Sequence, residues 1–217
     1  GSRLAAAFAS LDEDRANALL EESLALRSVE RTIEEVLLEA VTADAARAPR
    51  TPEYEFGWRY ATGWLSALKR LSPPATRRGC VLLLDASAPL DLDALYAQSL
   101  ELMLRRAGAR TLSLSTKISP NGLARALRAL DPKAVVLAGR DMSLDALGRL
   151  VYAVRLVAPQ ASILNFRGAV PDSGASTVRR LGPTPLAACE RLLGQLEGTR
   201  AGRSASLAEP LPATTAH

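Results

Sequence analysis

The sequence predicts an α/β protein built in two parts, a helical bundle followed by a doubly wound, mostly parallel sheet. From residue 4 to about residue 71, apolar residues recur every three or four positions, as they do along one face of a helix. From Cys80 onward, short apolar runs alternate with helical stretches, which is typical of strands covered on both faces by helices. The 217 residues are 48% hydrophobic, which is enough to bury a core in both parts.

Four helices are expected in the bundle, residues 4–71. They end near residues 9, 26, 48 and 71. The segment from Ser10 to Glu13 has the form of a capping box at the start of the second helix. Ser28 is suited to cap the third helix, and Thr51-Pro52 matches the cap and first-turn positions of the fourth.

A linker, residues 72–79, separates the two parts, because its Pro73-Pro74 pair cannot continue a helix. Residues 80–197 are then expected to form a flavodoxin-like, Rossmann-like domain. Its strands are expected at 80–84, 111–115, 134–138 and 162–166, with a fifth at 177–181, and its helices at 93–107, 121–130, 143–157 and 184–196. Residues 198–217 have little to bury, so a disordered tail is expected there.

The rarity of cysteine and histidine excludes several kinds of catalytic and metal site. Cys80 and Cys189 lie 109 positions apart, and His217 is the single histidine. The sequence therefore has no CxxC or HExxH zinc motif and no histidine-based triad. Both cysteines are expected to be small core residues of a reduced, cytoplasmic protein. We expect no metal site and no catalytic residues, since the best acid-base candidates are Asp91 and Asp93 with Tyr96, and no histidine or perturbed lysine lies beside them.

The charge and hydropathy of the chain say little about a nucleic-acid partner and do not suggest a membrane. The net charge is +4, and the basic residues are spread along the sequence. No apolar run approaches the 18 residues of a membrane span, and no signal peptide opens the chain. The leading Gly1-Ser2 is typical of a cloning scar, so we expect a piece of a longer protein.

Ligands of doubly wound folds bind beyond the carboxyl ends of the strands, so the loops there are where a site is expected. The loop at residues 85–91 has no glycine, which excludes the common phosphate-cradling motifs. A phosphoacceptor site would need an acidic cluster, and only Asp85 and Asp141 are available. Arg140 and Arg167 follow two predicted strands, where they would either meet an anionic ligand or remain solvated.

Several features together resemble the cobalamin-binding domain family, especially the sensory half of MerR-type light- and cobalamin-responsive transcription regulators. They are the order of elements, the long helix before the linker, and the segments Leu19-Leu20-Glu21-Glu22-Ser23-Leu24 and Leu104-Arg105-Arg106-Ala107-Gly108. The resemblance covers residues 4 to about 197. It implies a regulator that assembles into dimers or tetramers, with a DNA-binding domain that is absent from this chain.

The sequence departs from the family's cobalt-binding motif, Asp-x-His-x-x-Gly. The matching segment is 91–96, in which Asp91 agrees, Asp93 replaces the histidine, and Tyr96 replaces the glycine. A carboxylate is a poor substitute for imidazole as a cobalt ligand. The family's paired glycines correspond to Arg167-Gly168.

At two further positions the sequence also lacks the residues that the cobalamin-binding family uses to hold its cofactor. The serine after the third strand corresponds to Ala138. In the bundle's Trp…Glu-His motif, Glu55 is matched, but Phe56 and Ala45 replace the histidine and the tryptophan. We therefore expect that cobalamin is not bound through a histidine, and that another tetrapyrrole, a small aromatic ligand or no ligand at all takes its place.

These observations define a set of candidate ligand-binding residues around the cleft between the two parts. The set comprises Trp58, Asp91, Asp93, Tyr96, Arg140, Arg167 and Gly168. Each has a structural alternative: the two aspartates suit a helix cap, and the aromatic residues suit core packing. The function expected is a non-enzymatic sensory or oligomerisation domain of a cytoplasmic transcription regulator, and the alternative is a functional corrinoid protein, either a photoreceptor or a methyl carrier.

Overall fold

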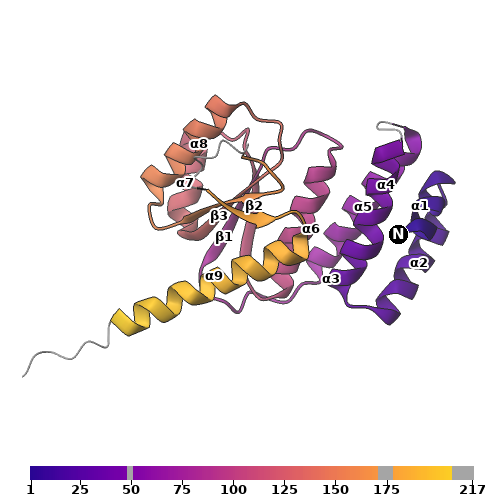
Figure 1. The fold of residues 1–217 in the computed structure, drawn as a ribbon, viewed down its shortest axis with the longest axis horizontal. Coiled ribbons are helices and arrows are strands. Elements are labelled where there is room, and N and C mark those ends of the chain that lie inside the picture. The colour runs from indigo at the N-terminus through magenta and orange to yellow at the C-terminus, as the bar shows by residue number, and fades with distance from the viewer. Residues whose placement is uncertain (48–50, 171–177, 207–217) are drawn as a thin grey trace, which may run out of the picture.

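The computed structural model describes residues 1–47, 51–170 and 178–206, and it has the two-part α/β architecture that the sequence predicts (Figure 1). The helices of the first part are α1 (Ser2–Ala9), α2 (Glu13–Leu26), α3 (Val29–Thr32), η1 (Ile33–Leu38), α4 (Glu39–Arg47) and α5 (Pro52–Arg70). The backbone remains helical where α3, η1 and α4 join, so they form one rod with a π-helical segment in its middle. The four-helix bundle is thus confirmed.

Side-chain caps start most of these helices, as expected, with one correction. The Ser28 and Thr51 hydroxyls accept hydrogen bonds from the backbone of Arg31 and Tyr54, which confirms both predicted caps. The capping box beginning at Ser10 is wrong, because the Asp12 carboxylate caps α2 through the N–H of Arg15. Ser10 instead donates its hydroxyl to the last turn of α1, and Leu11 turns the chain with a φ of 54°.

The second part is a five-stranded parallel sheet in the order β2-β1-β3-β4-β5, which confirms the flavodoxin-like topology. Its strands are β1 (Cys80–Asp85), β2 (Arg110–Ser115), β3 (Pro132–Ala138), β4 (Ser162–Phe166) and β5 (Arg179–Gly182). The helices are α6 (Leu92–Arg106), α7 (Pro120–Leu130), α8 (Leu144–Val157) and α9 (Pro185–Ser206). The chain connection after β1 leads to β2 on one side, whereas the connection after β3 leads to β4 on the other side. In such a fold, ligands usually bind at the carboxyl edge between these two strands.

The chain ends differently from the prediction. Helix α9 continues to Ser206, nine residues past the expected end of the domain at 197, so the tail does not begin at 198. Residues 207–217 lie outside the described part of the chain. Residue 177, where the fifth strand was expected to begin, also lies outside it, and β5 starts at Arg179.

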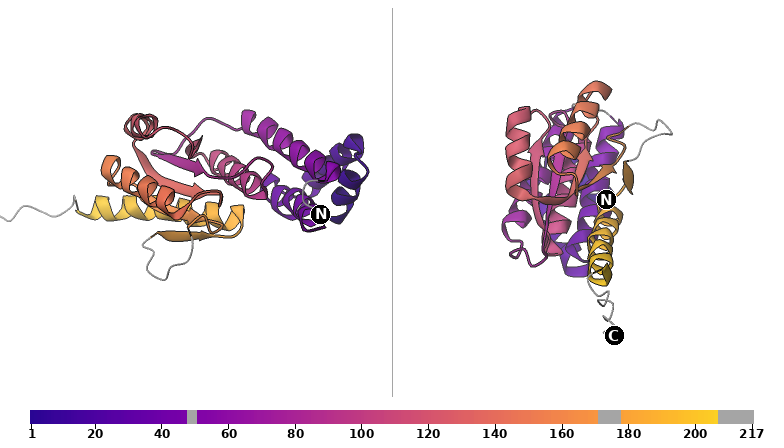
Figure 2. Two further views of the ribbon diagram at one scale, coloured as in Figure 1. Left: turned by 90° about the horizontal axis from the view of Figure 1, so that it is seen from above. Right: turned by 90° about the vertical axis from the view of Figure 1, so that its left-hand side faces the viewer.

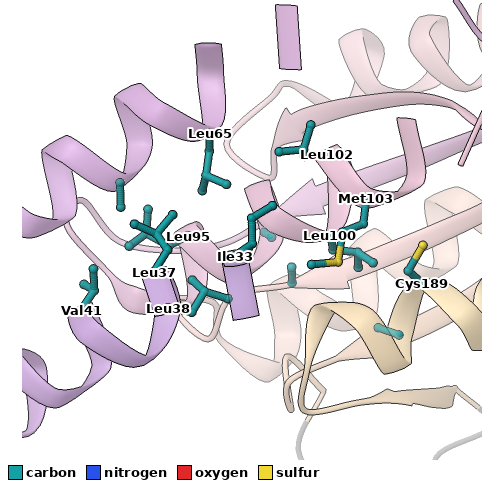
Figure 3. Close-up of a cluster of buried hydrophobic side chains, with 14 of the residues drawn as sticks. Ile33, Leu37, Leu38, Val41, Leu65, Leu95, Leu100, Leu102, Met103 and Cys189 are labelled. Atoms are coloured by element: carbon teal, nitrogen blue, oxygen red, sulfur yellow. The ribbon is translucent and has the colours of Figure 1, made fainter. Parts of the chain in front are cut away.

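Helices cover both faces of the sheet, and the bundle packs on one side only (Figure 2). Helices α7 and α8 pack on Leu82, Leu84 and their neighbours, whereas α6 and α9 cover the opposite face. Helix α6 is enclosed between the sheet and the bundle. Figure 3 shows this shared core, where Ile33 and Leu37 of η1 and Leu65 of α5 approach Leu95 and Leu100 of α6.

A buried ion pair also joins the bundle to α6. The Glu101 carboxylate is 2% exposed and accepts hydrogen bonds from Lys69 of α5 at 3.0 Å and from Arg105 at 2.9 Å. Arg105 further donates to the Thr111 carbonyl on β2. Since a buried carboxylate needs paired charge, these contacts hold α5, α6 and β2 together. No helix in the described part of the chain is long and apolar enough to cross a membrane.

Both cysteines are buried and free, as the sequence analysis expects. Burial, with smaller contributions from Glu190 and Glu30, raises the pKa of the Cys189 thiol to about 12, and burial also raises the pKa of Cys80. Only the thiolate reacts with alkylating agents, and at pH 8 about one molecule in ten thousand carries the Cys189 thiolate.

We therefore expect native protein at pH 8 to resist thiol labelling at both cysteines, followed by labelling of both once denaturant unfolds the chain. Mass spectrometry after iodoacetamide treatment measures this. Rapid modification of either thiol in the folded protein would contradict the burial described here.

Candidate functional site

A buried carboxylate, Asp93, joins the loops that follow β3 and β4 to the start of α6. Asp93 lies in the first turn of α6 and is 2% exposed. Its Oδ2 accepts a hydrogen bond from Arg140 Nε at 2.8 Å, and its Oδ1 accepts one from Arg167 Nε at 2.9 Å. Each oxygen therefore has its own charge-assisted partner. We call Asp93, Arg140, Arg167 and Tyr96 the Asp93 cluster.

Arg167 is held on three sides. Its guanidinium carbon lies 3.5 Å from the centroid of the Tyr96 ring, a close cation–π contact. The same guanidinium donates to the Pro183 carbonyl at 3.0 Å, between β5 and α9. Tyr96 in turn places its hydroxyl 3.4 Å from that of Thr42 on α4. The ring of Tyr96 thus fills the space between the bundle and the guanidinium.

Two aromatic residues of α5 attach the bundle to the loop before α6. Trp58 donates its indole N–H to the Asp91 carbonyl at 2.9 Å, and Tyr54 donates its hydroxyl to the Leu90 carbonyl at 2.7 Å. The Asp91 carboxylate caps α6 by accepting from the backbone N–H of Asp93. Leu90 has a φ of 61°, a strained value for a branched residue, so the two hydrogen bonds hold the loop in an unfavourable conformation.

The loops after β1 and β3 are joined directly at the position where a ligand of this fold usually enters. Ala86 donates its N–H to the Ala138 carbonyl at 2.8 Å, and Asp141 donates its N–H to the Ala86 carbonyl at 3.0 Å. Gly139 has a φ of 79°, and a Cβ there would lie 2.3 Å from the nitrogen of Ser87. Only glycine permits this approach.

The charges of the site are largely paired with one another. The hydrogen bond to Asp93, with that carboxylate's charge, raises the pKa of the Arg140 guanidinium. Burial, and then the charge of Asp91, raises the pKa of the Tyr54 hydroxyl. Both Asp93 oxygens accept hydrogen bonds from arginines, so the negative charge of this buried carboxylate is compensated within the chain. Among the described residues, no three His, Cys, Asp or Glu side chains are grouped as they would be to hold a metal ion.

The structure brings six of the seven candidate residues into one connected set. Trp58, Asp91, Asp93, Tyr96, Arg140 and Arg167 are linked through the contacts above. Gly168 only follows Arg167 in the loop, and a Cβ there would meet nothing within 4 Å. The sequence left two alternatives for Arg140 and Arg167, an anionic ligand or solvent. In the structure, both arginines instead pair with Asp93 of the same chain.

Sequence analysis missed three members of this network: Tyr54, Thr42 and Pro183. Tyr54 belongs to the aromatic part of α5, where its polar hydroxyl on a buried ring was the available signal. Thr42 and the carbonyl of Pro183 offered no signal, because their contacts depend on the packing of distant elements.

The residues present do not fit a cobalamin held from below by an imidazole. The described residues contain no histidine, and Asp93 at the family's histidine position has both oxygens engaged by arginines. Tyr96 and Arg167 stand at positions where the resemblance to cobalamin-binding domains places glycines, and here the guanidinium packs 3.5 Å from the ring centroid. Carboxylates are also harder ligands than the nitrogen donors that suit cobalt.

The helical bundle and the Rossmann-like sheet together form the fold of corrinoid proteins. The chain aligns with the monomethylamine corrinoid protein of Methanosarcina barkeri at a TM-score of 0.65, with 13% identity, over 88% of this chain and 96% of that chain. No family model matches the sequence, and no curated protein matches it.

Two further solved structures align at lower TM-scores. A cobalamin-binding protein from Desulfitobacterium hafniense DCB-2 gives 0.43, with 13% identity over 89% of this chain and 96% of that one. The methanol:cobalamin methyltransferase complex MtaBC of Methanosarcina barkeri gives 0.44, with 14% identity over 90% of this chain and 79% of that one.

Proposed function

We propose that this chain is a non-catalytic sensory or oligomerisation module with a corrinoid-protein fold, in which the Asp93 cluster replaces the cofactor's lower ligand. The observation that carries the proposal is the pairing of both Asp93 oxygens with Arg140 and Arg167. In this role the module joins subunits of a cytoplasmic, MerR-type transcription regulator. DNA contact then belongs to a separate domain.

The closed cluster supports a module that works through packing of the bundle on the sheet. Trp58, Tyr54 and Thr42 of the bundle all contact residues of the α/β part at the cluster. A ligand that bound between the bundle and the sheet would have to displace one of these contacts, and it would thereby shift the bundle. In a sensory module, a small aromatic or tetrapyrrole ligand would take the place of the Tyr96 ring beneath Arg167. In the simpler alternative, the module only assembles subunits and binds no ligand.

A functional corrinoid protein is the second candidate. It is favoured by the fold similarity over 88% of the chain to the Methanosarcina barkeri monomethylamine corrinoid protein. As a carrier or photoreceptor, the chain would bind the corrinoid without an imidazole ligand from the described residues.

Cobalamin binding separates the two candidates. We expect that protein mixed with hydroxocobalamin in the dark and then desalted will show no visible absorption of the corrin ring. Retained colour with a shifted band would establish the second candidate. Native mass spectrometry of the purified chain is the complementary measurement, since a co-purifying small molecule would identify the ligand class of a sensory module.

A further inference from the structure

Exposed apolar side chains gather on one face of α8, and two more stand singly near the ends of α2. The described residues include six large hydrophobic side chains that are more than half exposed. Three of them, Leu144, Tyr152 and Leu156, are on α8, and two, Leu11 and Leu26, lie at the ends of α2. Apolar residues gathered in this way are typical of interaction surfaces.

The α8 surface is basic. Leu144, Tyr152 and Leu156 recur at intervals of four and eight residues, so they follow one outward row of the helix, with the open Gly148 between them. Arg149 is exposed beside this row, and Arg125 and Arg128 are exposed on the adjoining α7. Among the described residues these three arginines form no ion pair. Asp145 also lies on this face. We call the outward side of α7 and α8 the basic surface.

The α2 surface is acidic. Glu13, Asp14 and Glu21 are exposed, and none of them forms an ion pair with a described residue; Arg15 is the one basic residue of α2 and is also exposed. The small residues Ala18 and Ala25 lie on the same outward row as Asp14 and Glu21. Burial is the largest cause that raises the pKa of the nearby Tyr60 to about 12, and the charges of Glu13 and Glu21 add to it. We call this side of α2 the acidic surface.

The charge of the whole chain is divided in the same way. Residues 1–71 contain nine Lys or Arg and twelve Asp or Glu, whereas residues 72–217 contain eighteen and eleven. The bundle is therefore net negative and the rest net positive. Figures 1 and 2 show α2 at one end of the molecule and α7 and α8 toward the other, so the two surfaces cannot meet within one chain.

We propose that the basic surface of α7 and α8 docks on the acidic surface of α2 in a second copy of this chain. Opposite charge steers the encounter, and the apolar side chains of the basic surface leave water when they cover the small residues Ala18 and Ala25. The contact joins two different surfaces, so it is head-to-tail and extends to a ring or an array. It rests on the self-association included in the proposed function, but it uses none of the residues of the Asp93 cluster.

Sedimentation velocity of the full chain at several protein concentrations tests the contact. We expect association at low salt that weakens as salt rises, because exposed charges are screened. Arg149→Glu and Glu21→Arg should each weaken association about tenfold or more, since like charges then face each other. Arg78→Glu is the matched control: Arg78 is exposed in the loop between α5 and β1, outside both surfaces, and its reversal should have little effect.

Mixing the two variants gives the sharper result. Arg149→Glu and Glu21→Arg exchange the two charges, so every contact between unlike copies joins side chains of opposite charge, and the mixture should associate although each variant alone does not. Circular dichroism confirms that each variant is folded.

Three results would overturn the proposal: a wild-type chain that stays monomeric at low salt, an effect of Arg149→Glu no larger than that of Arg78→Glu, or folded variants that fail to associate when mixed. Binding of a DNA duplex that Arg149→Glu abolishes, without self-association, would assign the basic surface to nucleic acid instead. Self-association through another surface would refute this contact and leave the proposed function standing, and the cobalamin experiment is independent of either outcome.

Discussion

Replacing Asp93 by asparagine is expected to lower the free energy of unfolding by about 2–4 kcal/mol. Removing one partner of a fully buried ion pair costs about 3–5 kcal/mol, because the remaining charge is left without compensation. The Arg140 side chain is 62% exposed and regains water, but Arg167 is 20% exposed and does not regain it fully. The expected loss therefore lies somewhat below the fully buried value.

Urea denaturation followed by circular dichroism measures this loss. Asp131→Asn is the matched control, since it removes the same charge from an exposed pair with Lys133. Exposed pairs contribute about 0–1 kcal/mol, so the control should change stability by no more than that. Equal effects of the two substitutions would mean that the Asp93 cluster does not hold the loops after β3 and β4 to α6.

Introducing the residues of the cobalamin-binding motif at three positions is expected to raise corrinoid affinity by an order of magnitude or more. The variant combines Asp93→His, Tyr96→Gly and Arg167→Gly. The first substitution supplies an imidazole that suits cobalt, and the other two remove the ring and the guanidinium that fill the space. Glycine also accepts the φ of 54° at position 167 without strain.

Titration with hydroxocobalamin, read from the visible spectrum after desalting, measures the gain. The matched control carries Asp93→Ala with the same two glycine substitutions, so it has the space without the imidazole, and it should lack the spectral shift of a nitrogen-ligated cobalt. Circular dichroism must show that both variants fold, because a glycine within α6 costs about 1 kcal/mol. A folded variant with no gain over wild type would mean that this fold no longer encloses a corrin-shaped space.

The positions of the helices and strands follow from short-range patterns, which is why most of them were predictable. Continuous apolar runs such as Val81–Leu84 can be buried only in a central strand, and Thr51-Pro52 starts a helix through its own hydroxyl and ring. The one misplaced cap, at Ser10, failed because Asp12 lies close enough to compete for the same helix start. The end of α9 was also misplaced, since composition alone suggested a tail.

The role of Asp93 shows the limit of such patterns. Locally it is suited to the first turn of α6, and the resemblance to the cobalamin-binding domains marks it as the position of a metal ligand. Its actual partners, Arg140 and Arg167, lie 47 and 74 positions further along the chain. Sequence placed both arginines at the carboxyl edge of the sheet but had no means of showing that they turn inward to a carboxylate.

The amino-acid sequence alone determined the order of elements, the parallel sheet and the absence of a histidine near the expected cofactor position, because each depends on residue type and spacing along the chain. Tertiary structure decided that the carboxylate at that position is neutralised from two neighbouring loops, and that unpaired charges of opposite sign lie on opposite ends of the molecule. The physical reason is that ion pairing and exposure depend on which distant segments the folded sheet and bundle bring together. A local sequence pattern contains no information on which distant residues become neighbours.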